Sequence, residues 1–153
     1  MISEGSKAPD FKLEGSDGKT HGLKDFKGRT LVLYFYPRDD TPGCTIEAKD
    51  FTKHNAEIEE AGGVVVGVSK DDLESHGKFC NKYKINYLLL SDPESATIKA
   101  YGSYGDRGIF GIGTLRKTFI IDRTGRIAKI YEKVKPMGHG ADVLSFIKGM
   151  AHM

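Results

Sequence analysis

Three short apolar runs, separated by two stretches with helical periodicity, constrain most strongly what this chain can fold into. The runs are residues 31–36, 64–68 and 87–90. Each has the length of a strand that is covered on both faces of a sheet. Between the runs, residues 41–61 and 71–84 place apolar side chains every three or four positions, as amphipathic helices do. The order strand–helix–strand–helix–strand predicts a layered α/β fold.

The remaining segments extend this pattern at both ends. Residues 9–29 alternate apolar and polar side chains around turn residues, which predicts an irregular β extension. A serine–aspartate–proline start predicts a short helix over 91–101. Residues 117–131 predict a β-hairpin, and 139–150 predict a final amphipathic helix. Five glycines within 102–113 predict a mobile loop.

The chain is expected to form one domain, residues 1–153. A chain of 153 residues can bury one proper core, and no linker rich in proline or serine divides it. The predicted architecture is an α/β sandwich with a mixed central sheet, helices on its faces and an N-terminal β extension. This element order resembles a thioredoxin-like domain with an inserted helix.

Charge and hydropathy disfavour several functional classes. The net charge of +2 is too mild for a nucleic-acid partner, and no block of lysine or arginine suggests one. No apolar stretch approaches the ~18–20 residues of a membrane span, and the N-terminus lacks a signal-peptide core. A cytoplasmic location is therefore expected. In a reducing compartment, two cysteines are expected to be either inert thiols or redox-active ones, and not a permanent structural disulfide.

Cys44 lies where the first strand gives way to a helix. Pro37 ends the strand, and Thr41-Pro42 is a typical helix start, with a hydroxyl N-cap followed by proline at the first helical position. Cys44 then falls in the first helical turn, where backbone N–H groups lack partners and the helix dipole favours negative charge. A thiolate should be stabilised there, which favours a reactive cysteine over an inert one.

Glu47 lies one turn beyond Cys44 on nearly the same face of the helix. A carboxylate beside a thiolate would work against its ionisation. The combination makes sense if a cation joins them, and Arg116, just before a predicted strand, is the candidate. The spacing also fits, more simply, a solvated Glu47 and a surface Arg116.

The second cysteine, Cys80, lies in the helix predicted for 71–84. The segment Ser69 to Asp72 has the spacing of a capping box, which predicts the start of this helix. An inward stripe is predicted from the spacing of Leu73, His76, Cys80 and Tyr83.

Other chemistries are disfavoured by spacing. A Cys-x-x-Cys dithiol would need a cysteine at position 47. No metal is expected, because the cysteines are not closely spaced and no histidine pair accompanies them. A cysteine hydrolase would need a histidine base, but the histidines are scattered and none is expected to act as one: His21, His54, His76, His139 and His152. The glycines of 102–113 do not open a helix after a strand, so no nucleotide cofactor is expected.

The segment from Pro37 to Cys44 matches the PxxxTxxC active-site motif of peroxiredoxins. Its flanks, Tyr34-Phe35-Tyr36 and Thr45-x-Glu47-Ala48, resemble the Q branch of that family, the bacterioferritin comigratory type. Ala8-Pro9-Asp10-Phe11-x-Leu13 resembles the family's opening, and Arg116-x-Thr118-Phe119-x-Ile121-Asp122 resembles its arginine-bearing strand. The resemblance therefore covers nearly the whole chain.

The resemblance implies thiol-dependent reduction of hydrogen peroxide and organic hydroperoxides, with Cys44 as the attacking thiolate. Thr41 and Arg116 would hold the peroxide and stabilise charge on the leaving oxygen. Pro37 would shield the sulfenic acid from water, and Glu47 would position Arg116. Phe110, in the predicted loop, is a candidate apolar contact for an organic hydroperoxide.

The resemblance also bears on how Cys44 is reduced again. Many members carry a resolving cysteine five residues after the first, but here that position is Lys49. Cys80, 36 residues on (80 − 44), resembles a second subtype, which implies a Cys44–Cys80 disulfide reopened by a thioredoxin-like reductant in a monomer or weak homodimer. Two alternatives stay open: a one-cysteine enzyme with a silent Cys80, and a redox-inactive thioredoxin-like binding or chaperone module.

Overall fold

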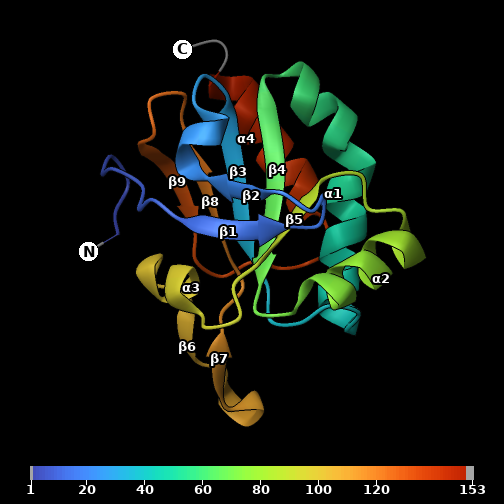
Figure 1. The fold of residues 1–153 in the computed structure, drawn as a ribbon. Helices are drawn as coiled ribbons and strands as arrows, with labels where there is room; N and C mark the ends of the chain where they lie inside the picture. Colours follow the sequence, from blue (N-terminus) through green and yellow to red (C-terminus); the bar gives the residue numbers. More distant parts are fainter. Residues whose placement is uncertain (1, 151–153) are drawn as a thin grey trace.

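The apolar run at residues 31–36 forms most of β3 (Thr30–Phe35), a central strand of a seven-stranded sheet (Figure 1). This is a computed structural model, and it describes residues 2–150. The strands follow one another across the sheet as β2 (Thr20–Gly22), β1 (Lys12–Gly15), β5 (Leu88–Ser91), β4 (Gly63–Ser69), β3 (Thr30–Phe35), β8 (Lys117–Ile121) and β9 (Ile127–Tyr131). Strands β3, β4 and β5 are parallel, whereas β1, β2, β8 and β9 join antiparallel. The predicted mixed sheet and N-terminal β extension are confirmed.

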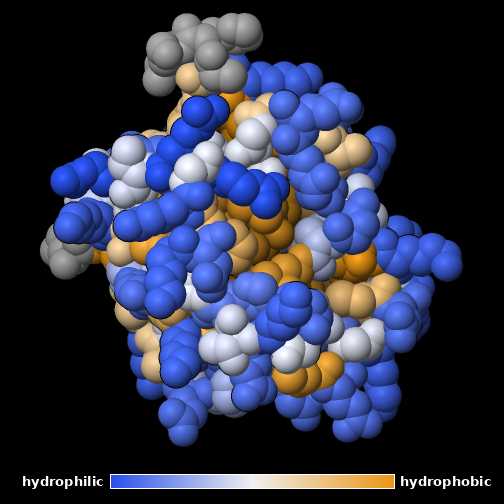
Figure 2. Space-filling view, turned by 45° about the horizontal axis from the view of Figure 1, so that its top comes forward, coloured by the Kyte–Doolittle hydropathy of each residue, from blue (hydrophilic) through white to orange (hydrophobic). Residues whose placement is uncertain are grey.

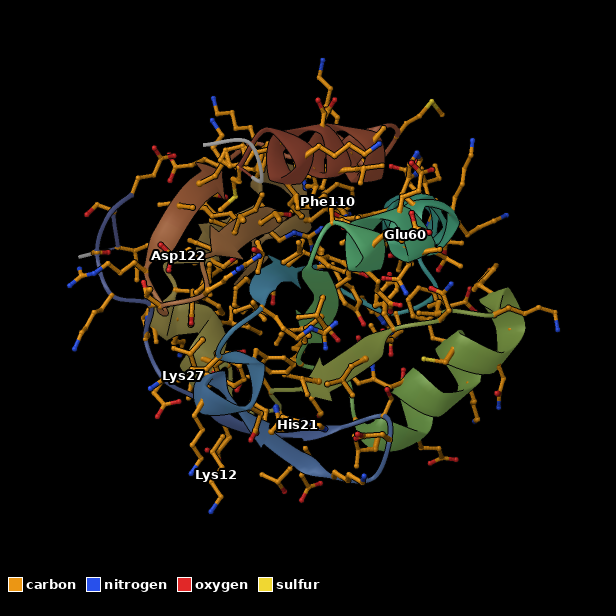
Figure 3. All side chains as sticks on the ribbon, turned by 90° about the horizontal axis from the view of Figure 1, so that it is seen from above. Lys12, His21, Lys27, Glu60, Phe110 and Asp122 are labelled. Carbon is orange, nitrogen blue, oxygen red and sulfur yellow. The ribbon has the colours of Figure 1, made fainter. Side chains whose placement is uncertain are left out.

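Helices cover both faces of this sheet. They are α1 (Pro42–Glu60), α2 (Leu73–Tyr83), α3 (Ala96–Ala100) and α4 (His139–Met150), with a short 3-10 helix η1 (Leu23–Phe26) near the N-terminus. Viewed from above, α1 and α4 lie side by side on one face, and α2 lies farther along that face (Figure 3).

The pleat of β3 divides the core in two. Val32, Tyr34 and Tyr36 point to the face covered by α1, α2 and α4. Leu31, Leu33 and Phe35 point to the other face, under α3 and the N-terminal segment. All six residues of β3 are buried, because successive side chains of a strand point to opposite faces and both faces are covered. On the face shown in Figure 2, charged and polar side chains predominate around an apolar hollow near the centre of the view.

Two predicted helix starts are wrong. Helix α2 is capped by Asp72, whose carboxylate accepts from the backbone N–H of Ser75, and not by a box beginning at Ser69. Ser69 lies at the end of β4, where its hydroxyl donates to Asp71. Helix α3 begins at Ala96, because the residues before it continue β5 and then turn.

The predicted inward stripe of α2 needs correction as well. The fully buried side chains on this helix are His76 and Phe79, whereas Cys80 is half-buried at the edge of the core. The buried face of α2 is therefore centred on His76 and Phe79, and the Phe79 ring packs beside Tyr36. Cys80 is left closer to solvent.

The glycine-rich segment is not a plain loop. It forms a small hairpin of β6 (Tyr104–Asp106) and β7 (Ile112–Thr114), with the 3-10 turn η2 (Gly108–Phe110) at its tip. Gly108 and Gly111 have positive φ angles, which let the chain reverse at the tip. Phe110 is 71% exposed there, and its contact with a hydroperoxide stays a prediction.

Two further observations concern the described residues alone. No helix within residues 2–150 combines the length and apolar character needed to cross a bilayer. In the same residues, no group of histidine, cysteine and acidic side chains is arranged to hold a metal ion.

Candidate active site

Cys44 is the third residue of α1, at the end of the sheet where β3 finishes. Thr41 is the N-cap residue in an extended conformation, and Pro42 occupies the first helical position, as predicted. The carbonyl of Thr41 accepts the first helical hydrogen bond, from Thr45, at 2.8 Å. The Cys44 side chain is 2% exposed, so its sulfur sits inside the first turn and not on the surface.

Arg116 joins Cys44 to Glu47. Its Nη1 donates to Oε1 of Glu47 at 2.7 Å, and its Nη2 donates to Sγ of Cys44 at 3.4 Å. Antiparallel pairing of β8 with β3 sets Lys117 opposite Phe35, which brings Arg116 to the end of β3 beside α1. The predicted placement of the arginine between carboxylate and sulfur is present, and the solvated alternative is wrong, because Glu47 is fully buried.

Burial and charge act in opposite directions on this group of side chains. Burial raises the pKa of Glu47 to about 7, although the neighbouring Arg116 pulls in the other direction. Burial alone would lower the pKa of Arg116, but the charges of Glu47 and Cys44 raise it. The guanidinium is thus held as a cation in a largely desolvated site, where its interactions are stronger than in water.

Gly43 also belongs to this arrangement, and no pattern in the sequence singled it out. A Cβ atom at this position would lie 3.0 Å from Nη2 of Arg116. Glycine therefore leaves the space in which the guanidinium approaches the sulfur. A Pro-Gly-Cys sequence at a helix start is the only signal that could have indicated it.

The Thr41 hydroxyl does not cap the helix as predicted. Its Oγ1 donates to the carbonyl of Arg38 at 2.9 Å, and no side-chain cap bond is formed. The oxygen lone pairs of the hydroxyl stay free of any bond within residues 2–150. Pro37 is buried and follows β3, which ends at Phe35.

Comparison with known proteins is consistent with this site. Residues 5–130 match the model of the AhpC/TSA family. The chain belongs to the AhpC/TSA family. Peroxiredoxin Bcp of Bacillus subtilis is 44% identical over 153 residues, covering 98% of both chains. A putative peroxiredoxin, bcp, of Helicobacter pylori is 45% identical over 146 residues, covering 94% of this chain and 96% of the relative.

Solved structures agree. A cysteine-to-serine mutant of PrxQ from Xylella fastidiosa superimposes with a TM-score of 0.94 at 33% identity, covering 99% of this chain and 98% of that one. Peroxiredoxin Q of Xanthomonas campestris superimposes with a TM-score of 0.88 at 35% identity, covering 92% of this chain and 91% of that one. The predicted thioredoxin-like fold and the resemblance to the Q branch are confirmed. The protein is a thiol-dependent peroxidase, and the alternative of a redox-inactive module is rejected.

The other cysteine of this peroxiredoxin faces a different part of the surface. Cys80 lines an open groove of about 570 Å³ together with Ser16, Tyr87 and Leu88. Both cysteines are free thiols. Burial raises the pKa of Cys80, and the negative charge of Asp39 adds to this effect. Cys80 is therefore held as a thiol in the folded peroxiredoxin.

Two histidines are buried among residues 2–150, and both are engaged elsewhere. His139 Nε2 shares a hydrogen bond of 2.8 Å with Thr118, and burial lowers the pKa of His139 to about 4. His76 is bonded to Asp39 and to the carbonyl of Leu90. Within residues 2–150, the hydrogen bond of the Cys44 sulfur is to Arg116 and not to a histidine.

Glu47 is expected to make the stability of this peroxiredoxin depend on pH. Since its pKa rises from 4.5 to about 7 on folding, the folded protein keeps a proton that the unfolded chain releases over this range. The unchanged protein should therefore lose about 3 kcal/mol of its free energy of unfolding, relative to Glu47→Gln, as the pH rises from 4.5 to about 7. Urea unfolding of both proteins across the range measures it. A difference that does not change with pH would contradict the expectation.

Proposed function

We propose that Cys44 attacks the substrate, and that the substrates are hydrogen peroxide and organic hydroperoxides. The observation that carries this proposal is the guanidinium of Arg116, which contacts both Sγ of Cys44 and Oε1 of Glu47. A fixed cation stabilises a thiolate, and its remaining N–H groups can bind an oxygen atom. The bacterioferritin comigratory protein of Xanthomonas campestris is described with alkyl peroxide reduction activity, which supports organic substrates.

In the proposed reaction, the Cys44 thiolate attacks one oxygen of the hydroperoxide. An S–O bond forms as the O–O bond breaks, and the bonding pair leaves on the second oxygen. That oxygen takes up a proton and departs as water or an alcohol. The sulfur is oxidised to a sulfenic acid, and the peroxide is reduced.

Four side chains would assist this reaction or protect its product. Arg116 stabilises the charge that develops on the leaving oxygen, and Glu47 keeps its guanidinium in place. The Thr41 hydroxyl already donates to Arg38, so it would accept from the peroxide O–H. Pro37, buried at the end of β3, would keep water from the sulfenic acid.

Cys80 is proposed to resolve the sulfenic acid. Its thiol would attack Cys44 Sγ, release the oxygen as water and form a Cys44–Cys80 disulfide. A thioredoxin-like dithiol would then reduce that disulfide by exchange and become oxidised itself. Spacing supports this assignment: the two cysteines replaced by serine in the Xanthomonas structures are also 36 residues apart.

Disulfide formation would require a local rearrangement. A disulfide needs Cα atoms about 4.4–6.8 Å apart, whereas packed helices lie with their axes ~8–10 Å apart. Cys44 is buried in α1, and Cys80 lies in the groove beside β5. The start of α1, the helix α2, or both would unwind during each cycle.

Replacing Cys80 with serine tests the resolving role. Peroxide consumption with dithiothreitol should stay close to that of the unchanged protein, because a small thiol can reach the sulfenic acid directly. Consumption with thioredoxin, thioredoxin reductase and NADPH should fall to background, because no intramolecular disulfide forms. NADPH absorbance follows the second assay. Undiminished thioredoxin-driven turnover would instead favour a one-cysteine enzyme with a silent Cys80.

Partners and location complete the proposal. The protein is proposed to work as a single domain of residues 1–153, as a monomer or weak homodimer. Neither cofactor, metal, nucleic acid nor membrane would take part, and a cytoplasmic location is proposed. The chloroplastic peroxiredoxin Q of Suaeda salsa is 40% identical to this chain, so the same enzyme type also works in another compartment.

A further inference from the structure

The turn that leads from β3 to Cys44 is bonded to both ends of α2, the helix that carries Cys80. Two consecutive residues of this turn, Asp39 and Asp40, make the bonds. In Figure 1 the start of α1 lies beside α2, at the lower right of the main body and above the level of the β6–β7 hairpin. Neither carboxylate bonds to Cys44 or Arg116 within the described chain, so the peroxide chemistry does not account for them.

The first contact is buried and joins Asp39 to the first turns of α2. Its Oδ2 accepts from Ser75 Oγ at 2.8 Å and from His76 Nδ1 at 2.7 Å. Its Oδ1 accepts from the Tyr36 hydroxyl at 2.5 Å. Every oxygen of this carboxylate is therefore engaged, which is the condition for burying a charge without a large cost.

His76 is cationic in this arrangement. Its Nε2 lies 2.8 Å from the carbonyl oxygen of Leu90, which can only accept, so Nε2 carries a proton. Nδ1 faces the Asp39 carboxylate and carries the second proton. Burial alone would lower the pKa of His76, but Asp39 raises it above its ordinary value. The turn and α2 are thus joined by a buried ion pair.

The second contact is exposed and joins Asp40 to the last turn of α2. Its Oδ2 lies 2.9 Å from Lys82 Nζ, and its Oδ1 accepts from the Tyr83 hydroxyl at 2.7 Å. Asp40 has a φ of +55°, a conformation that aspartate and asparagine tolerate better than most residues. This contact is weaker than the buried one and is screened by salt.

Cys80 lines a different groove from the one beside these two contacts. Its groove is lined by Gly77, Asn81 and residues of the β5 side, whereas the groove at the turn is lined by Ser75, Lys82 and both aspartates. The two grooves have no lining residue in common. Cys80 can reach Cys44 only if the start of α1, the helix α2, or both rearrange, and any movement of α2 away from the turn breaks these bonds.

We propose that Asp39 and Asp40 are positioning residues that set the rate at which Cys80 resolves the Cys44 sulfenic acid. Together with Ser75, His76, Lys82 and Tyr83 they form an aspartate clasp, which holds α2 folded while the peroxide reacts. Opening of the clasp then admits Cys80 to the sulfenic acid. This inference rests on the resolving role proposed for Cys80.

Lys82→Met tests the clasp at its exposed end. Reduced protein is mixed with hydrogen peroxide, quenched with acid and alkylated, and intact mass separates thiol, sulfenic and disulfide forms over time. The rate of disulfide formation should rise about two- to five-fold, the effect expected from losing an exposed ion pair. The second-order rate of sulfenic acid formation should stay the same.

Lys78→Met is the matched control. Lys78 lies one turn earlier on α2, where it pairs with Glu74 at 3.6 Å. It lines the same groove as Asp39 and Asp40, but within residues 2–150 it has no hydrogen bond or ion pair with the turn. Lys78→Met removes the same charge from the same helix but leaves the bonds to the turn intact. It should therefore change neither the rate of sulfenic acid formation nor the rate of disulfide formation. Asp40→Asn, which suits the positive φ, should reproduce the effect of Lys82→Met from the other partner.

The salt dependence of disulfide formation gives a further test, because it would not change in Lys82→Met if the clasp only stabilised the fold. Added sodium chloride should speed disulfide formation in the unchanged protein and in Lys78→Met, but much less in Lys82→Met, because the screened pair is already gone. Equal disulfide rates in Lys82→Met, Asp40→Asn and the unchanged protein would overturn the clasp alone. If the unchanged protein forms no Cys44–Cys80 disulfide, the resolving role fails and the clasp fails with it.

Discussion

Replacing Cys44 with serine is expected to lower the rate of peroxide reduction by about 10³-fold or more, the scale seen when an enzyme loses its nucleophile. The hydroxyl of serine is far less nucleophilic than a thiolate and cannot form a stable sulfenic acid. Serine is close to cysteine in size, so the buried first turn of α1 should keep its shape. Hydrogen peroxide consumption with dithiothreitol measures the loss.

Cys80→Ser in the same assay is the matched control for this prediction. It makes the same chemical change at the other cysteine and should leave the dithiothreitol-driven rate nearly unchanged. Circular dichroism and thermal unfolding of both variants show whether each is folded. A folded Cys44→Ser variant with the activity of the unchanged protein would refute the assignment of Cys44.

Arg116→Lys is expected to lower the second-order rate constant with hydrogen peroxide by about 10²–10³-fold, the range for losing one preorganised donor. Lysine keeps the charge but is a single flexible point donor. Arginine instead offers fixed N–H groups to Glu47 and to the Cys44 sulfur at once. Pseudo-first-order oxidation of Cys44 at several peroxide concentrations, followed by mass, gives the rate constant.

Glu47→Gln separates positioning from direct catalysis. Because Glu47 bonds to Arg116 and not to Cys44, its effect should pass through the arginine. Glu47→Gln should then slow oxidation in the unchanged protein but add little in the Arg116→Lys background. A loss below ten-fold in Arg116→Lys, or full additivity of the two changes, would contradict the proposed roles.

The parts of the fold that depend on local pattern could be predicted from the sequence. The three apolar runs became β3, β4 and β5, since buried parallel strands need side chains that are apolar on both faces. Thr41 and Pro42 located the start of α1, because a proline at the first helical position loses no hydrogen bond. That start placed Cys44 in the first turn.

The parts that depend on tertiary contacts could not be predicted. Asp39 and His76 are 37 residues apart, and only the packing of α2 against the turn makes them an ion pair. The local spacing at Ser69 suggested a capping box, but Asp71 is used to bind the turn and Asp72 caps the helix. The glycines of 102–113 gave no apolar alternation, yet backbone pairing alone makes β6 and β7 a hairpin.

The proposed catalytic cycle requires that one peroxide molecule convert Cys44 and Cys80 into one disulfide. Reduced protein is treated with one equivalent of hydrogen peroxide, alkylated, and digested with trypsin, which should yield residues 39–49 and 79–82 as separate peptides. We expect a single species in which these two peptides are joined by a disulfide bond. A Cys44 peptide carrying sulfenic or sulfinic acid, beside an alkylated Cys80 peptide, would contradict it.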